Sequence, residues 1–367
     1  MSKIKMMMVL PTFASGGAER VMLNILNHLD REVFEPVLYL QQAEGEHLSA
    51  LKEDVEIITP GSRRGLTRLL FLRREIRRIR PRIVFIMLLP IAGLAARLSA
   101  SGAVTVLRET ESRPKTQVHQ GAFISWLNRA GMRACDLYIA PAEGTKKYLL
   151  DRYHLEADRI HVFHNPVDIA RIEQLAKSPV AVDCEEFNLV AVGRLTYQKG
   201  FDLLIEALAT LVEIPWRLRI LGEGPDEELL RDLATQAGLA ERIEFLGIQS
   251  NPYAYMAHSD LLVLSSRWEG LPNVVLEGMA SGVPVLATRC PTGPDEIITP
   301  GVDGQLCEIN AESIADAIRQ LYEQRATLGE LANAARKRIK TFDLPNIMQQ
   351  YEAFFKDHSG RVTGSHG

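Results

Sequence analysis

The sequence predicts an α/β protein with two doubly wound domains. Short apolar runs of strand length alternate with longer amphipathic segments of helix length along most of the chain, and this alternation is typical of parallel sheets covered by helices. Several of the apolar runs lead into a glycine-bearing loop and then into a helix, as in the units of a doubly wound sheet. The chain has 367 residues, which is long for one domain and enough for two that each bury a core.

Composition and charge narrow the classes of partner. The chain is 46% hydrophobic and 24% charged, as in a soluble globular protein. Its net charge of −4 provides no general argument for nucleic-acid binding. Residues 1–168 contain 24 Lys and Arg against 18 Asp and Glu, whereas the remainder contains 18 against 28. The two halves are therefore expected either to have different partners or to present different surfaces.

Cysteine spacing and the lengths of the apolar runs indicate a protein of the reducing cytosol. The four cysteines fall at no paired or metal-ligand spacing, so neither a disulfide framework nor a zinc site is expected. The apolar run at residues 6–10 is too short for a secretion signal and is followed by Pro11. The longest apolar run, residues 83–96, is too short to span a bilayer and contains Pro90.

The first domain is expected to span residues 1–168 and to begin with a strand at 4–10, a glycine loop and a helix at 18–29. Gly16 and Gly17 allow the backbone of this loop to approach a ligand closely, and the helix start offers free N–H groups. An ordinary tight turn is the alternative, because the spacing is not that of dinucleotide-binding loops. Further strands are expected at 34–40, 55–58, 83–88, 103–107 and 137–140, with helices at 46–52, 92–99, 123–134 and 142–151.

An arginine-rich segment, residues 63–82, lies between two of these strands. Its leucines and isoleucines can form one apolar stripe of a helix, with arginines on the flanks and on the opposite side. Such a helix can lie on anionic lipid or contact a lipid diphosphate. The alternative is a helix packed on the sheet with a solvated basic face. The arginines expected to contact an acceptor or a membrane are Arg63, Arg64, Arg73, Arg74 and Arg77, together with Arg20 of the first helix.

Residues 169–186, with Pro179 and mixed polarity, are expected to link the domains, and residues 187–344 to form the second domain. A strand at 187–192 leads into a loop that carries Arg194 and Lys199. Two loop cations five residues apart can bracket a diphosphate through charge-assisted hydrogen bonds, and the alternative is that both are solvated. Further strands are expected at 217–221, 243–246, 260–264 and after residue 282, with helices at 201–211, 226–237, 273–281, 311–324, 328–340 and 345–357.

The stretch from Ser265 to Thr288 combines a strand end, a loop, a helix and a further strand. Glu269 lies in the loop, and Glu277 lies about two turns along the helix on the side that looks back at the loop, so two carboxylates are expected to line one crevice. Carboxylates accept hydrogen bonds from hydroxyls, and helix starts attract anions, so a ligand with sugar hydroxyls and phosphates suits this stretch. The alternative is that both glutamates are merely solvated.

Three motifs of the sequence resemble those of one enzyme family. The run Glu269-Gly-Leu-Pro-Asn-Val-Val-Leu-Glu277, followed by Gly-Met-Ala-Ser-Gly-Val-Pro-Val, resembles the E-x7-E signature of retaining GT-B glycosyltransferases of family 4, also called group 1. The loop Gly-Arg194-Leu-Thr-Tyr-Gln-Lys199-Gly resembles the family's G-R-L-x-x-x-K-G element, and Gly-Gly17-Ala-Glu-Arg resembles its first loop. The resemblance implies two Rossmann-like domains that face a cleft, with the last helix crossing back onto the first domain.

The resemblance also implies roles for residues of this sequence. Arg194 and Lys199 would stabilise negative charge on the leaving diphosphate. Glu277 would hold the ribose, and Glu269 the hydroxyls of the donor sugar. Glu109 follows the strand expected at 103–107, near the place where many relatives have a histidine, so the chain departs from that version. The implied donor-binding residues are Gly16, Gly17, Arg194, Lys199, Ile248 beside the base, Glu269, Gly270, Leu271 and Glu277, and the implied catalytic residues are Glu109, Arg194, Lys199 and Glu269.

The implied activity is that of a hexosyltransferase of class EC 2.4. It would move a hexose or N-acetylhexosamine from a nucleotide sugar, expected to be UDP-linked, to a lipid-linked or polysaccharide acceptor in bacterial lipopolysaccharide, O-antigen or capsule assembly, with retention of configuration. No metal or other cofactor is expected, since the sequence has no Asp-x-Asp triplet. The expected location is cytoplasmic, peripheral on the inner face of the plasma membrane. The alternatives are a GT-B nucleotide-sugar epimerase or phosphorylase and a non-catalytic nucleotide-sugar-binding protein.

Overall fold

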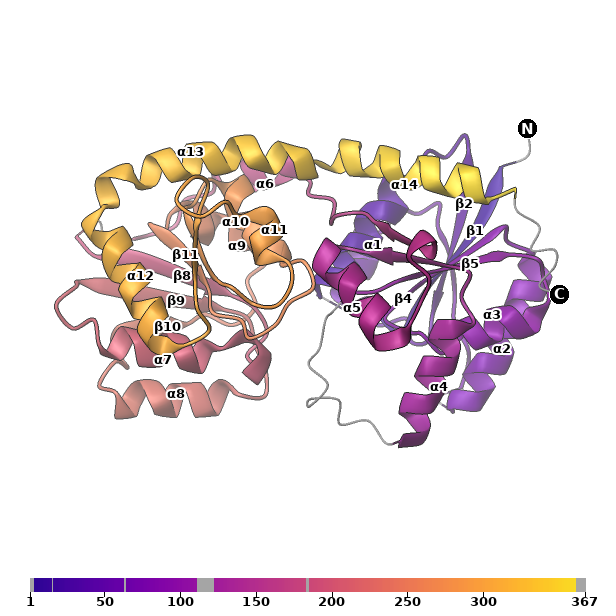
Figure 1. The fold of residues 1–367 in the computed structure, drawn as a ribbon, viewed down its shortest axis with the longest axis horizontal. Helices are drawn as coiled ribbons and strands as arrows, with labels where there is room; N and C mark the ends of the chain where they lie inside the picture. The colour runs from indigo at the N-terminus through magenta and orange to yellow at the C-terminus, as the bar shows by residue number, and fades with distance from the viewer. Residues whose placement is uncertain (1–2, 15, 63, 111–121, 183–184, 361–367) are drawn as a thin grey trace. The chain divides into compact units, whose positions relative to one another are not determined.

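The structure is a computed structural model that describes residues 3–14, 16–62, 64–110, 122–182 and 185–360. The chain divides into two compact units, of which the first comprises Met1–Pro166 and Leu344–Gly367 and the second Val167–Asp343. Each unit contains one parallel sheet (Figure 1). The predicted α/β class with two doubly wound sheets is therefore confirmed, and the last helix is part of the first unit, as predicted.

The sheet of the first unit has seven parallel strands in the order β3-β2-β1-β4-β5-β6-β7. The strand order reverses direction between β1 and β4, and such a switch point opens a crevice at the carboxyl ends of the strands. Strand β1 pairs with β2 along its whole length. The strands are β1 (Ile4–Leu10), β2 (Phe34–Leu40), β3 (Glu56–Ile58), β4 (Ile83–Met87), β5 (Val104–Arg108), β6 (Leu137–Ala140) and β7 (Ile160–Val162).

Helices cover both faces of this sheet, and successive residues of β1 enter different cores. Met6 and Met8 join a core closed by α1 and α14, whereas Met7 and Val9 join a core closed by α2, α3 and α5. Because both faces are buried, most residues of the longer strands are apolar. The helices are α1 (Gly17–His28), α2 (Gly65–Ile79), α3 (Ala92–Ser99), α4 (Ala122–Arg133), α5 (Glu143–Tyr153) and α14 (Leu344–His358).

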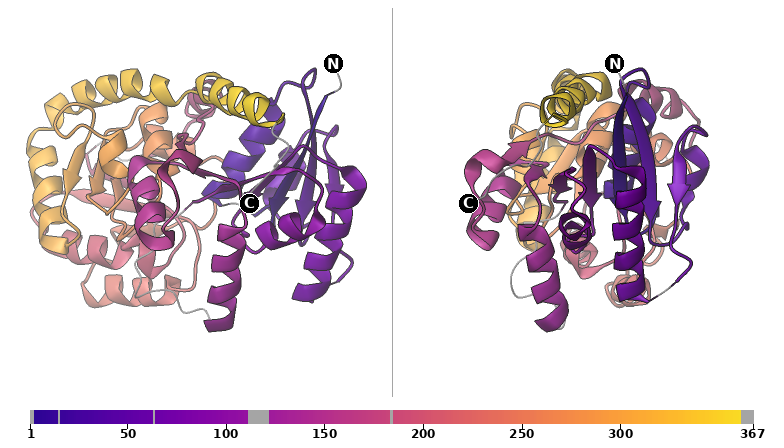
Figure 2. Two further views of the ribbon diagram at one scale, coloured as in Figure 1. Left: turned by 45° about the vertical axis from the view of Figure 1, so that its right-hand side comes forward. Right: turned by 90° about the vertical axis from the view of Figure 1, so that its right-hand side faces the viewer.

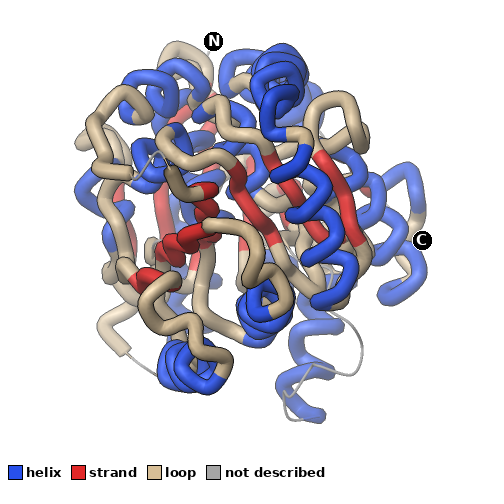
Figure 3. Tube along the Cα trace, turned by 90° about the vertical axis from the view of Figure 1, so that its left-hand side faces the viewer, coloured by secondary structure: helices blue, strands red, loops and turns tan. Residues whose placement is uncertain are grey.

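The sheet of the second unit has six parallel strands in the order β10-β9-β8-β11-β12-β13. Figures 2 and 3 show the strands of this unit between layers of helices. The strands are β8 (Phe187–Val192), β9 (Trp216–Leu221), β10 (Ile243–Phe245), β11 (Leu261–Leu264), β12 (Val285–Thr288) and β13 (Gln305–Cys307). The helices are α6 (Ile169–Leu175), α7 (Phe201–Ala209), α8 (Glu227–Gln236), α9 (Pro252–Ala257), α10 (Asn273–Ser281), α11 (Pro294–Ile297), α12 (Ala311–Glu323) and α13 (Leu328–Arg338).

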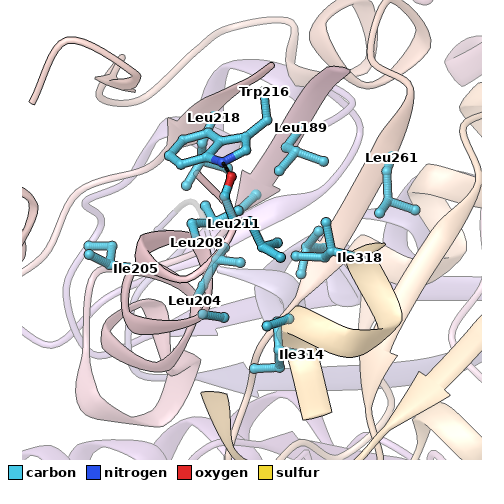
Figure 4. Close-up of a cluster of buried hydrophobic side chains, with 14 of the residues drawn as sticks. Leu189, Leu204, Ile205, Leu208, Leu211, Trp216, Leu218, Leu261, Ile314 and Ile318 are labelled. Carbon is cyan, nitrogen blue, oxygen red and sulfur yellow. Dashed lines mark hydrogen bonds between the residues drawn. The ribbon is translucent and has the colours of Figure 1, made fainter. Parts of the chain in front are cut away.

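The core of the second unit is built around Trp216, a fully buried residue at the start of β9. Leucine and isoleucine side chains from β8, α7 and α12 surround its ring (Figure 4). The indole Nε1 donates a hydrogen bond of 3.0 Å to the carbonyl of Leu211, which satisfies the polar atom that burial would otherwise leave without a partner. This core fixes α7 and α12 on one face of the sheet.

Several short elements differ from the prediction. Residues Glu46–Ala50 form a 3-10 helix where an α-helix at 46–52 is expected. Helix α6 lies inside the segment 169–186 expected to be a linker, and it begins where the Asp168 carboxylate accepts a hydrogen bond of 3.1 Å from the backbone N–H of Arg171. Strands β7 and β13 and helix α9, each of three to six residues, were not predicted. Among the described helices, none is long and apolar enough to cross a membrane.

Candidate active site

The loop after β8 carries the two predicted phosphate-binding cations in different environments. Arg194 is exposed, and within the described part of the chain its guanidinium forms no ion pair. Lys199 ends a single 3-10 turn and is half-buried. The next residue, Gly200, has a φ of +63°, and a side chain there would overlap the carbonyl oxygen of Ser265. The sequence therefore needs glycine at this position to bring the loop against the end of β11.

Lys199 meets the predicted sugar-binding carboxylate directly. Its Nζ lies 2.6 Å from Oε1 of Glu269, and the Ser266 hydroxyl donates a hydrogen bond of 2.7 Å to the same oxygen. The side chains of Lys199 and Glu269 are 18% and 9% exposed, so solvent screens their attraction less than at an open surface. Two residues that the sequence assigned to different parts of a ligand are thus brought together.

Further contacts join the loops after β8 and β11. The Ser265 hydroxyl donates to the Lys199 carbonyl at 2.9 Å. Arg267 donates two hydrogen bonds, of 2.8 and 2.6 Å, to the carboxylate of Asp202, and its guanidinium lies over the ring of Tyr197. Burial alone would raise the pKa of Asp202, but the hydrogen bonds and charge of Arg267 outweigh burial and hold that pKa below its usual value. The loops therefore form one connected rim.

Glycines extend this rim to the ends of β9 and β10. The Gly222 backbone N–H donates to the Gly247 carbonyl at 2.8 Å, and the Gly193 N–H donates to the Leu221 carbonyl at 3.0 Å. Gly222 has a φ of +127°, and a side chain there would overlap the carbonyl of Gly193. Ile248, the predicted contact for the base, follows Gly247 and is 49% exposed. An apolar side chain is thus presented at the edge of the rim.

Helix α10 and the segment after β12 hold the other side of the Glu269 loop. Gly270 and Leu271 are buried, and Glu277 is half-buried in the middle of α10. The Thr292 hydroxyl donates a short hydrogen bond to the Glu269 carbonyl. Gly293 has a φ of +98°, and a side chain there would overlap the carbonyl of Gly270. The backbone on both sides of the Glu269 carboxylate is therefore fixed.

Sequence reasoning missed the residues that hold these charged groups. Ser265 and Ser266 follow β11 directly, and Thr292 precedes a glycine with positive φ. Their position at strand ends of an α/β sheet was the available signal. Their partners, Lys199 and Glu269, lie far away in sequence, so only the fold reveals the contacts. No cluster of three or more His, Cys, Asp or Glu suited to a metal occurs among the residues that the structure describes.

The first unit contains the predicted glycine loop. Gly16 precedes α1 with extended backbone angles, and its carbonyl accepts a hydrogen bond of 3.0 Å from the Arg20 N–H. A side chain at Gly16 would overlap the carboxylate of the buried residue Glu19. Gly17 is exposed at the first position of the helix. Because Gly16 has no side chain, the Glu19 carboxylate has room at the N-terminus of α1, the end of a helix that favours negative charge.

Arg108 is a buried structural residue. It is 2% exposed, its Nε donates to the Tyr351 hydroxyl at 2.8 Å, and its Nη2 donates to Oδ1 of Asn165 at 2.5 Å. The first contact joins β5 to α14 and the second joins β5 to the segment after β7, so the Arg108 guanidinium is held inside the first unit. The next residue, Glu109, is half-buried at the carboxyl end of β5. Burial, and secondly the charge of Glu109, raise the pKa of Tyr153 of α5.

The predicted acceptor or membrane arginines divide between two helices. Arg63 lies outside the described residues. Arg73 and Arg77 of α2 donate hydrogen bonds of 2.9 Å each to the carbonyls of Leu98 and Ser99 at the end of α3. Arg64 is exposed just before α2, and Arg74 forms an ion pair of 3.0 Å with Glu75. Arg20 belongs to α1, which covers the opposite face of the sheet. The structure does not bring Arg20 together with the others.

Comparison with known sequences agrees with these motifs. The family model described as Glycosyltransferase Family 4 matches residues 15–171, and the one described as Glycosyl transferases group 1 matches residues 174–338. The chain is 30% identical over 213 residues, 58% of each protein, to the N-acetylgalactosamine-N,N'-diacetylbacillosaminyl-diphospho-undecaprenol 4-alpha-N-acetylgalactosaminyltransferase of Campylobacter jejuni. It is 36% identical over 167 residues, 45% of this chain and 46% of the relative, to the lipopolysaccharide core biosynthesis glycosyltransferase LpsE of Rhizobium meliloti. The chain thus spans about half the length of these curated relatives.

Solved structures identify the fold. The crystal structure of Anabaena Alr3699/HepE in complex with UDP and glucose superimposes with a TM-score of 0.81, at 21% identity, over 96% of this chain and 100% of that chain. This similarity confirms the predicted GT-B fold. The two family matches together run from residue 15 to residue 338 and meet near the boundary between the two units. The chain therefore belongs to the GT-B glycosyltransferases of family 4.

Proposed function

We propose that the chain is a retaining glycosyltransferase that moves a hexose or N-acetylhexosamine from a UDP-sugar to a hydroxyl of a lipid-linked or polysaccharide acceptor. The main support is the ion pair between Lys199 and Glu269 on the glycine-rich rim of the second unit. The Anabaena structure contains UDP and glucose, and the Campylobacter relative is named for a diphospho-undecaprenol substrate. The first name favours a nucleotide-sugar donor, and the second favours a lipid-linked acceptor.

In this proposal the cations receive the leaving diphosphate. Arg194 is exposed and forms no ion pair within the described residues, so its guanidinium is available to an incoming phosphate. Lys199 lies in the same loop as Arg194 and forms an ion pair with Glu269. When the bond to the anomeric carbon breaks, negative charge grows on the diphosphate, and each well-placed donor removed from such a site costs about 3 kcal/mol of transition-state stabilisation.

Glu269 would orient the donor sugar. Its Oε1 accepts hydrogen bonds from both Lys199 and Ser266. Among the residues that the structure describes, none donates a hydrogen bond to the second oxygen, Oε2. A carboxylate with one oxygen fixed presents the other in a defined direction, and sugar hydroxyls are suitable donors to it. Glu277 would hold the ribose, while Ile248, Gly270 and Leu271 would contact the nucleotide or its sugar.

The first unit would receive the acceptor. Glu109 lies half-buried at the carboxyl end of β5, beside the tyrosines of α5, and would orient the attacking hydroxyl. Gly16 and Gly17 would allow close approach of the donor at the start of α1. Transfer would take place at the inner face of the plasma membrane, and the reaction is proposed to need no metal or other cofactor.

Two measurements test this function. A thermal-shift screen of nucleotide sugars should raise the melting temperature with one or more UDP-sugars, because a ligand at about a hundred times its Kd stabilises the folded state by about 2.7 kcal/mol. Glu277→Ala should remove most of that shift while the unliganded melting temperature stays unchanged. Release of UDP should then require an acceptor. Absence of any shift would contradict donor binding, and an epimer or a sugar phosphate formed without acceptor would replace transfer by a different reaction.

A further inference from the structure

Large apolar side chains are exposed on three neighbouring helices of the first unit. Phe123, Ile124 and Trp126 of α4 are 71%, 53% and 61% exposed. Leucines of α2 and α3 add to them, with exposed fractions between 54% and 72%. Single exposed apolar residues are common, but a group of large ones marks a contact surface. We call this group the α2–α4 surface: Leu66, Leu70, Leu98, Phe123, Ile124 and Trp126.

The three helices form one layer over the same face of the sheet. Leu72 of α2, Ala92 of α3 and Met132 of α4 all enter the core on that face. Helix α3 packs against both α2 and α4, and the three helices lie next to one another in Figures 1 and 2. A side chain at Gly93 of α3 would overlap the carbonyl of Gly131 of α4, so these two helices cross in close contact. The outer side of the layer therefore belongs to one compact unit.

The same layer carries a strong positive charge. There are five arginines in α2, one in α3 and two in α4, and the only acidic residue within the three helices is Glu75. Glu75 is buried and pairs with Arg74 and Arg78. The partner of this surface must therefore accept apolar side chains and also carry negative charge.

We propose that the α2–α4 surface docks on an anionic phospholipid bilayer, with the aromatic residues of α4 inserted at the level of the headgroups. Aromatic side chains favour this interfacial region, and long arginine side chains can keep their charge at the phosphates while their stems lie along apolar surface. Each basic residue near an anionic leaflet adds to the attraction. A second copy of the chain fits less well, because it would bring two arginine-rich layers together.

This inference deepens the proposed function and rests on its lipid-linked acceptor. It also changes the part assigned to the arginine-rich segment. Arg73 and Arg77 hold the end of α3 through its carbonyls, so they position the layer as well as contributing charge. The aromatic side chains inserted at the headgroups belong to α4, which lies outside that segment.

Tryptophan fluorescence provides a direct test. The chain has three tryptophans, and Trp216 and Trp268 are buried whereas Trp126 is exposed. Vesicles of phosphatidylcholine with phosphatidylglycerol should shift the emission to shorter wavelength, and brominated lipid should quench it. Trp126→Phe should lose both signals and still co-sediment with the vesicles. Vesicles of phosphatidylcholine alone should give a much weaker response, because the charge contribution is lost.

Two double variants distinguish vesicle binding through the α2–α4 surface from non-specific binding through other exposed apolar side chains. Phe123→Ser with Ile124→Ser should weaken vesicle binding by roughly tenfold or more, since two apolar side chains no longer leave water. Val212→Ser with Val302→Ser removes apolar side chains of the second unit that are 74% and 56% exposed, and it should leave vesicle binding unchanged. The proposal would be overturned if anionic vesicles left the tryptophan emission unaltered and the two double variants sedimented equally with them. Concentration-dependent dimerisation without vesicle binding would assign the surface to a second copy instead.

Failure of the membrane-docking proposal can be distinguished from failure of the proposed transferase function. Transfer to a water-soluble acceptor analogue should proceed equally well in the wild type and in the Phe123→Ser, Ile124→Ser variant, because these residues lie outside the proposed catalytic groups. If vesicle binding is found and transfer is not, the surface stands and the transferase proposal fails. If transfer is found and the anionic vesicles are not bound, the surface proposal fails alone.

Discussion

Lys199 and Glu269 form an ion pair of 2.6 Å between loops that follow two adjacent strands, β8 and β11. Glu269 thereby holds the lysine ammonium in place, and the lysine holds one carboxylate oxygen. In the proposed reaction a diphosphate would compete with Glu269 for Lys199, so donor binding and carboxylate orientation become coupled. This coupling is absent when each residue is considered alone, as in the sequence.

The first prediction concerns this pair. Lys199→Met and Glu269→Gln should each lower kcat/KM for transfer by about a hundredfold or more, because each removes a charged group from the site. The double variant should lose less than the product of the two effects, since the residues act together. Steady-state kinetics with circular dichroism as a folding control would measure this. Fully multiplicative losses would show that the pair is not coupled.

A second prediction concerns Gly200. Gly200→Ala should reduce transfer strongly and lower the free energy of unfolding by at least about 1–2 kcal/mol, because a side chain at positive φ is strained and would overlap the Ser265 carbonyl. The control is Gly329→Ala in α13, where no atom lies within 4 Å of the added carbon, and alanine should stabilise the helix by about 1 kcal/mol. Equal effects of the two substitutions in urea denaturation would refute the argument.

The third prediction tests the contact between β5 and α14. Tyr351→Phe should lower the free energy of unfolding by about 1.5–3 kcal/mol, the usual contribution of a hydrogen bond to a charged group, because the buried Arg108 loses its 2.8 Å partner. Tyr322→Phe is the matched control, since the Tyr322 hydroxyl makes no hydrogen bond within the described chain. Chemical denaturation of both variants provides the comparison, and a Tyr351→Phe protein as stable as the control would contradict it.

A fourth prediction concerns alkaline pH. Burial raises the pKa of Tyr39 to about 12, whereas an unfolded tyrosine titrates near 10. Tyr39 therefore stays protonated to a higher pH in the folded state than in the unfolded state. Its contribution to the free energy of unfolding is complete below pH 10 and is lost as the pH rises toward 12. Over that window the wild type should lose about 2–3 kcal/mol more than Tyr39→Phe. Denaturation midpoints of both proteins at pH 9 and pH 11.5 would test this, and parallel curves would show that Tyr39 does not contribute.

Local patterns in the sequence predict much of the fold. Strands such as Ile4–Leu10 and Phe34–Leu40 have the predicted bounds, because the apolar runs at residues 6–10 and 37–40 reflect burial on both faces. Helix α10 also has its predicted bounds, and it is preceded by Pro272 and followed by Gly282 with positive φ. Short elements such as β7 are missed, since three residues carry too little periodicity to separate a strand from a loop.

The sequence predicts the candidate site less completely, because its contacts are long-range. The motifs identify Lys199 and Glu269 but place them on different parts of a ligand, and only the fold brings their side chains together. Arg108 stands at a strand end like a ligand-binding residue, and its burial under Tyr351 depends on a helix more than 200 residues away. Exposure cannot be read from composition, so the aromatic face of α4 also required the structure.

Helix α14 has a consequence for synthesis of the protein. Its side chains Ile347, Tyr351 and Phe355 complete a core whose strands are made first, near residues 4–10 and 34–40. On the ribosome, the core that α14 completes therefore stays partly exposed until the entire second unit has been translated. During that interval Phe34 and Phe85, which pack against Phe355 in the finished protein, are available to chaperones or to neighbouring nascent chains.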